Sequence, residues 1–156
     1  MKGSFKLLNI AGIGIFIHWT FTLLIAYIIY SNYQAQYTTV QIVWSVIFIL
    51  SIFVTVFLHE LGHALAAKKF NIKTKDITIL PIGGLAPLGE TPEKPIEELN
   101  VAIAGPAVNI AIALITGLFI SITGVKDLTN QLASEVNQSN FFLNFFMVNI
   151  WLAIFI

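Results

Sequence analysis

The sequence has no cysteine and little charge. The absence of cysteine excludes disulfide bonds and thiolate metal sites. Only 10% of the residues are charged, whereas a soluble domain of this length has about a quarter. The eight basic residues are balanced by eight acidic ones, so the chain has no basic excess with which to bind nucleic acid. The N-terminus also lacks a small-residue cleavage site after an apolar core, so we expect the first apolar stretch to be retained.

Most of the residues are apolar. They make up 57% of the chain, and the mean hydropathy is +0.86. Because about 20 apolar residues span a bilayer as a helix, the long charge-free runs predict an all-α polytopic membrane protein with about four transmembrane helices. We expect these helices near residues 18–33, 40–67, 99–123 and 141–156, within a single domain over residues 1–156.

The lysines predict which side of the membrane each loop faces. Lys2 and Lys6 precede the first predicted helix, and residues 68–96 carry five more lysines, whereas residues 34–39 carry none. Lysine-rich segments face the cytoplasm in most membrane proteins. We therefore expect a multi-pass protein of the cell membrane, with the N-terminus and the 68–96 loop in the cytoplasm.

Two apolar stretches favour β structure. "SFKLLNIAGIGIFI", residues 4–17, has glycines between short β-branched runs and predicts a small hairpin at the membrane surface. "DITILPIGGLAPLG", residues 76–89, is too rich in proline and glycine for a helix and predicts a short membrane-associated β segment. Non-helical backbone survives at membrane depth where it lines a cavity, so this segment is a candidate cavity wall. A surface loop is the alternative.

The segment "VFLHELGHALAAKKF", residues 56–70, contains the chain's candidate metal site. His59 and His63 lie four residues apart, so a helix places both imidazoles on one face, where they can bind one zinc ion. Glu60 can take a proton from a zinc-activated water. Catalytic zinc normally has three protein ligands and one open position. Gly62 and the alanines around it would let another helix approach closely.

An accidental motif is the plain alternative. Glu60 is the only Asp, Glu, Lys or Arg between Thr38 and Ala67, and it lies about 12 Å along a helix from Lys68. An unpaired carboxylate at that depth costs several kcal/mol unless it has a partner or a function. The metal interpretation is therefore favoured.

Two further polar residues have open interpretations. His18 starts the first predicted helix and is either a helix-end group or a residue near the zinc. Asn109 lies among alanines and isoleucines in the third predicted helix. It can link two helices, or it can donate a hydrogen bond to the oxyanion of a tetrahedral intermediate.

Three motifs in order, "HELGH", "LPIGGLAPL" and "AGPAVNI", resemble the site-2 protease family of intramembrane zinc metalloproteases. The opening "FKLLNIAGIGIFIHWTF" is similar to a branch that often carries C-terminal nucleotide-sensing CBS domains. The resemblance implies zinc-dependent cleavage of a transmembrane protein substrate in the bilayer. It assigns His59 and His63 to zinc, Glu60 to the role of base, and Asn109 to a place near the active site. It also implies that the strand containing Gly83, Gly84 and Leu85 holds the substrate in extended form.

The sequence departs from this family at its end. The family's third zinc ligand is an aspartate shortly after a segment like "NIWLAIF", and here the chain ends at Ile156. We therefore expect that the chain is truncated and that the third ligand lies beyond Ile156; Asp76 and Asp127 fall in loops and are not assigned to zinc. The alternative function is a catalytically inactive scaffold that binds transmembrane partners. A small transporter would need polar residues on several helices, and the chain has few.

Overall fold

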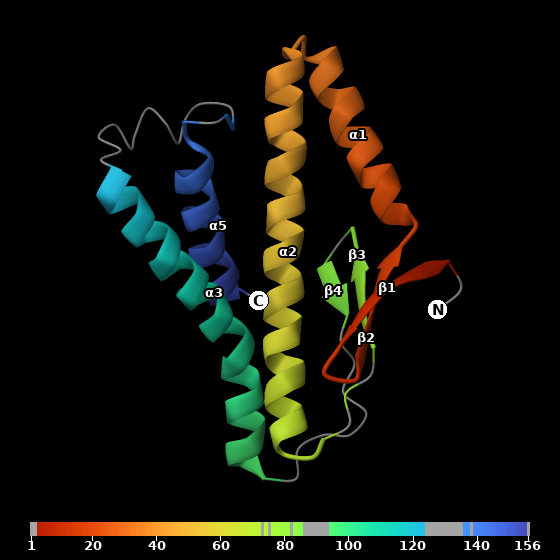
Figure 1. Ribbon diagram of the computed structural model, residues 1–156, viewed down its shortest axis with the longest axis vertical. Helices are drawn as coiled ribbons and strands as arrows, with labels where there is room; N and C mark the ends of the chain where they lie inside the picture. Colours follow the sequence, from red (N-terminus) through yellow and green to blue (C-terminus); the bar gives the residue numbers. More distant parts are fainter. Residues whose placement is uncertain are drawn as a thin grey trace.

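A long helix runs through the centre of the computed structural model, with helices on one side and a helix and a small sheet on the other (Figure 1). The structure describes residues 3–72, 74, 76–81, 83–85 (backbone alone), 94–123, 136–137 and 139–155. Its elements, in order, are β1 (Ser4–Ile10), β2 (Ile13–His18), α1 (Thr20–Gln34), α2 (Thr39–Lys69), β3 (Ile77–Leu80), β4 (Gly83–Leu85), α3 (Pro95–Thr123) and α5 (Phe141–Phe155).

The central helix, α2, has defined ends. Its 31 residues extend about 46 Å. At the N-terminus, Thr38 and Gln41 form a reciprocal capping box. At the other end Asn71 adopts a left-handed conformation, with φ of 61°. The N–H of Ile72 then donates to the carbonyl of Ala67 at 3.1 Å, which is the Schellman arrangement that stops a helix.

The four strands form one sheet in the order β1-β2-β3-β4. Ala11 and Gly12, with φ of 52° and 85°, make the two-residue turn between β1 and β2, and both φ values suit a type I′ hairpin. β2 pairs with β3 in parallel, and β3 pairs with β4 antiparallel. The predicted hairpin and β segment are both present. Their parallel pairing into a single sheet was not predicted, because no local pattern encodes a contact between residues so far apart.

The sheet is fixed to the end of α2 by apolar and polar contacts. Buried side chains of β2, β3 and α2 make one cluster, which contains Ile13, Ile77, Leu61 and Ala64. The Nζ of Lys68 also donates to the carbonyl of Ala11 at 2.6 Å. These contacts place the sheet beside the half of α2 that carries the HELGH motif.

The predicted helices are all present among the described residues, but two of them are short. α2 and α3 are long and apolar enough to cross a membrane, whereas α1 and α5 have 15 residues each. Four membrane-spanning helices were expected from the sequence, whereas length and composition support two candidate spans in the described part of the chain. The first helix begins at Thr20 because residues 13–18 belong to β2.

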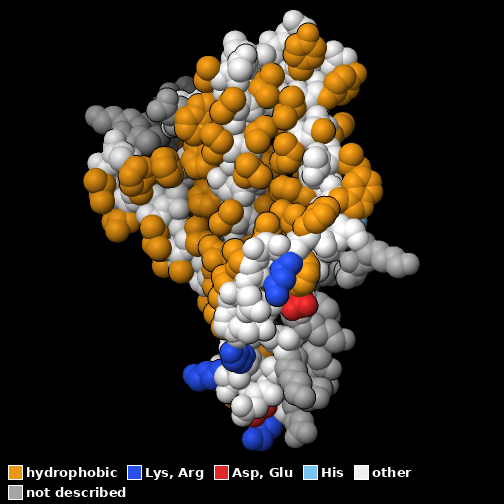
Figure 2. All heavy atoms as spheres, turned by 45° about the vertical axis from the view of Figure 1, so that its right-hand side comes forward, with side chains coloured by type: hydrophobic (Ala, Val, Ile, Leu, Met, Phe, Trp, Pro, Cys, Tyr) orange, Lys and Arg blue, Asp and Glu red, His pale blue; other side chains and the backbone are white. Residues whose placement is uncertain are grey.

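The long helices expose their apolar side chains. In the most apolar 18-residue stretch of α2 only 6% of the residues are buried. In the corresponding stretch of α3, 22% are buried. A core helix of a soluble protein would be mostly buried. Figure 2 shows apolar side chains covering the upper part of one face, with lysine and acidic side chains at its lower end. This distribution suits helices that face lipid.

Candidate metal centre

His59 and His63 meet on one face of α2. Their Nε2 atoms lie 2.9 Å apart, and their ring centroids are separated by 4.7 Å. His59 is only 2% exposed, and His63 is half-buried. The two imidazoles therefore lie on the same face of the helix, as their four-residue spacing predicts, and they converge through their Nε2 atoms.

Residues of α3 hold the other nitrogen of each imidazole. His63 Nδ1 lies 2.7 Å from the carbonyl oxygen of Val101, which can only accept, so Nδ1–H donates. Asn109 Nδ2 lies 3.0 Å from His59 Nδ1. Metal-binding histidines usually have such a partner on the second nitrogen, which orients the ring. Both partners lie on α3, about 40 to 50 residues away from the histidines in the chain.

Two glycines allow α3 to come this close. A Cβ at Gly105 would lie 2.6 Å from His59 Nε2 and closer still to His63 Nε2. A Cβ at Gly62 would lie 2.9 Å from the carbonyl oxygen of Ala104. The expectation that Gly62 permits a close helix contact is therefore confirmed. Gly105 was not predicted to take part in the site, although its place four residues before Asn109 puts both on one face of α3.

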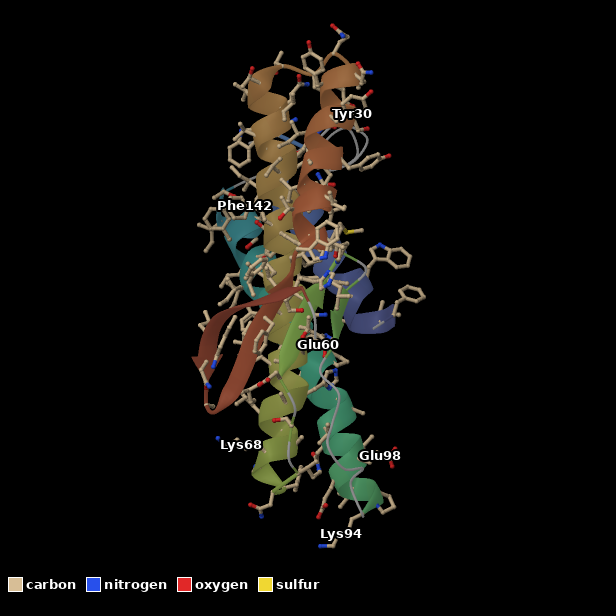
Figure 3. The ribbon with its side chains drawn as sticks, turned by 90° about the vertical axis from the view of Figure 1, so that its right-hand side faces the viewer. Tyr30, Glu60, Lys68, Lys94, Glu98 and Phe142 are labelled. Carbon is tan, nitrogen blue, oxygen red and sulfur yellow. The ribbon has the colours of Figure 1, made fainter. Side chains whose placement is uncertain are left out.

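Glu60 follows His59 on α2 and is half-buried. Figure 3 shows it at the height of the sheet, above Lys68. Among the described residues there is one ion pair, between Lys94 and Glu97. Glu60 therefore has no Lys or Arg partner among them.

The remaining candidates lie apart or are only partly described. His18 Nδ1 lies 2.7 Å from the hydroxyl of Thr20 at the start of α1, a contact that fits the helix-end interpretation. Gly83, Gly84 and Leu85 form β4, which packs against α2. In the part of the chain that the structure describes, no group of three His, Cys, Asp or Glu side chains could hold a metal ion. The third ligand stays a prediction, and Asp127 falls outside the described residues.

The side chains present fit part of a zinc site. Two imidazoles present converging Nε2 atoms, both Nδ1 atoms have partners on α3, and a side chain at Gly105 would fill the space at the Nε2 atoms. Imidazole nitrogen is a preferred zinc ligand. The pair is therefore suited to supply two of the three protein ligands.

Known proteins that resemble this chain include zinc metalloproteases, in agreement with a zinc site at the histidine pair. The model of peptidase family M50 matches residues 47–155. A protein named zinc metalloprotease from Methanocaldococcus jannaschii is 42% identical over 115 residues, which cover 74% of this chain and 32% of that protein. The stage IV sporulation protein FB of Bacillus subtilis is 32% identical over 104 residues, which cover 66% of this chain and 35% of that protein. The chain thus spans about a third of the length of these relatives.

A solved structure shares the fold. The site-2 protease from Methanocaldococcus jannaschii superposes with a TM-score of 0.65 at 30% identity, over 97% of this chain and 63% of that one. The resemblance noted in the sequence therefore extends to the arrangement of helices and sheet.

Proposed function

Since the chain belongs to peptidase family M50, we propose that it forms part of the core of a zinc-dependent intramembrane endopeptidase. The observation that carries this proposal is the histidine pair, whose Nε2 atoms converge beside Glu60 on a helix long enough to cross a bilayer. The substrate class is a transmembrane protein, because the site lies on a candidate span rather than on a loop.

We propose that the protein is a multi-pass protein of the cell membrane. α2 and α3 cross the bilayer, and α1 and α5 complete four crossings with the help of flanking residues. The N-terminus and the 68–96 loop face the cytoplasm. Support comes from the lysines of the described residues, which lie toward one end of the face in Figure 2.

Each residue of the site has a role in this proposal. His59 and His63 would hold zinc through Nε2. When bound, zinc supplies Lewis acidity that polarises a peptide carbonyl and acidifies water. Glu60 takes a proton from the attacking water on its carboxylate and passes it to the leaving amine. Val101 and Asn109 orient the two imidazoles from α3.

The sheet would bind the substrate. β4 is the last strand of the sheet and packs against α2, the helix that carries Glu60. An extended peptide can add to such an edge through backbone hydrogen bonds. A helical substrate must unwind before its peptide bond is accessible, so we propose that residues Gly83, Gly84 and Leu85 receive the unwound segment.

The test compares Glu60→Gln with wild type in the full-length protein, reconstituted in liposomes with a single-helix membrane substrate. We expect the variant to retain zinc and to lose cleavage by at least about 100-fold, the lower range for loss of a general base. Glu98→Gln is the matched control, because Glu98 is an exposed carboxylate on α3. Equal cleavage by wild type and Glu60→Gln would refute the base assignment.

An inactive scaffold is the second candidate function, and the same assay tests it. A scaffold would capture the membrane substrate equally in wild type and Glu60→Gln, with no cleavage in either. Glu60 argues against this outcome: it has no basic partner among the described residues, and a binding scaffold gains nothing from an unpaired charge at membrane depth.

A further inference from the structure

Asp76 is the residue immediately before β3, and its carboxylate reaches across to β2. Its Oδ1 accepts a hydrogen bond from the backbone N–H of Gly14 at 2.9 Å, although the two residues lie 62 positions apart in the chain. Gly14 leaves the space for this contact, because a Cβ there would lie 2.5 Å from the same oxygen. The contact therefore joins the segment that follows α2 to the hairpin that precedes α1.

This hydrogen bond lies at the end of a short strand pairing. β2 and β3 pair in parallel through three residue pairs: Ile15 with Ile77, Phe16 with Thr78, and Ile17 with Ile79. Gly14 and Asp76 immediately precede the first of these pairs, so the carboxylate continues the pairing by one residue through a side chain. The three paired residues of β3 are all buried. Because a slip of one residue would turn each of them to the other face of the sheet, we expect the carboxylate to hold β3 in its register.

The position of β3 determines the position of β4. β4 is the last strand of the described sheet, and β3 is its neighbour there, through antiparallel pairing. β4 also packs against α2, and Figure 3 shows Glu60 of that helix at the height of the sheet. A displacement of β3 along β2 would therefore carry β4 with it and change its position relative to Glu60.

We propose that Asp76 is a positioning residue that sets the substrate-binding edge of β4 through its bond to Gly14. The part of this inference that concerns substrate rests on the proposed function, whereas the effect of Asp76 on β3 does not. Asp76 acts through the sheet and not on the reacting atoms. Its loss should therefore weaken the binding of substrate rather than slow the chemical step.

Three variants separate the hydrogen bond from other effects. Asp76→Ala removes the acceptor of the Gly14 N–H. Asp76→Asn removes the negative charge and keeps an oxygen that can accept the same bond. Glu98→Ala is the matched control, because it removes an exposed carboxylate from a different element, α3.

The first experiment measures hydrogen exchange at the β3 amides of the full-length protein in micelles, by mass spectrometry. Asp76→Ala should exchange about 10-fold faster than wild type, the lower range for loss of a hydrogen bond to a charged group. Asp76→Asn and Glu98→Ala should remain close to wild type. Unchanged exchange in Asp76→Ala, or equally fast exchange in Asp76→Asn, would overturn the inference.

The second experiment measures cleavage in liposomes as a function of the mole fraction of a single-helix membrane substrate. Asp76→Ala should raise KM by about 10-fold with little change in kcat, because the apparent affinity falls with the fraction of molecules whose β4 is in place. Asp76→Asn should restore the KM of wild type, and Glu98→Ala should not alter it.

Two results would count against the role of Asp76 in substrate binding. One is an unchanged KM in Asp76→Ala, and the other is a loss confined to kcat. Failure of wild type itself to cleave would refute the proposed function instead, and the exchange measurement would still decide whether Asp76 holds β3.

Discussion

The two halves of α2 lie in different surroundings. In the first half no side chain is buried, and some large apolar ones lie open, such as Val40 and Val43, which are 66% and 49% exposed. All buried residues of the helix lie in the second half: Thr55, Val56, His59, Leu61, Ala64 and Ala67. There the sheet packs on one side and α3 on the other (Figure 1). A polar site can form in a membrane helix where protein, rather than lipid, covers it.

Small residues explain the difference. In the second half, Gly62 and Gly105 bring the backbones of α2 and α3 together, and Ala64 lets the sheet approach. Close approach of this kind stabilises helix pairs in membranes, where burial of apolar surface provides little driving force. The first half of α2 has larger side chains and no glycine or alanine.

The largest expected effect comes from Gly105→Ala. The added methyl would occupy the space at the Nε2 atoms of His59 and His63, so we expect at least about a 100-fold loss of zinc affinity, the upper range for changes around a metal site. The measurement is chelator competition on the purified protein. Gly117→Ala is the control on the same helix, because its methyl would meet only the ring of Phe146, at 3.1 Å. Comparable losses in both variants would mean that general helix packing, not the metal pair, is affected.

An intermediate effect is expected at the contact between α2 and the sheet. Leu61 is 9% exposed and packs against Ile13 and Ile77, so Leu61→Ala should destabilise the fold by about 2 to 4 kcal/mol through the cavity that it leaves. Val43→Ala, in the open half of the helix, should cost less than about 1 kcal/mol. Unfolding in mixed detergent micelles measures both. Similar losses would show that the two halves are equally packed.

The smallest effect is expected where the second half of α2 ends. Asn71 has φ of 61°, a conformation that costs a β-branched residue about 1 to 2 kcal/mol. Asn71→Val should therefore lower stability by about this amount, whereas Asn71→Gly should be nearly neutral. The same unfolding assay compares the two variants. A destabilised glycine variant would indicate that the side chain of Asn71, and not its backbone, matters.

Much of the molecule follows from local sequence. Charge-free apolar runs place the helices to within a few residues, since the apolar character of a segment is a local property. The HELGH spacing likewise places His59 and His63 on one helix face. The membrane crossings were less predictable: four were expected, but α1 and α5 have 15 residues each, and length and composition support α2 and α3 as candidate spans among the described residues.

The sequence by itself determined which side chains can bind a metal and on which face of α2 they lie, because a helix fixes neighbours three and four residues apart. Only the tertiary structure decided what surrounds them. Val101 and Asn109 reach the two imidazoles from α3, and Gly105 leaves room at their Nε2 atoms. The sheet pairs β2, which precedes α2 in the chain, with β3, which follows it. These contacts depend on how two helices pack and on where a strand returns, which are long-range properties that no local pattern contains.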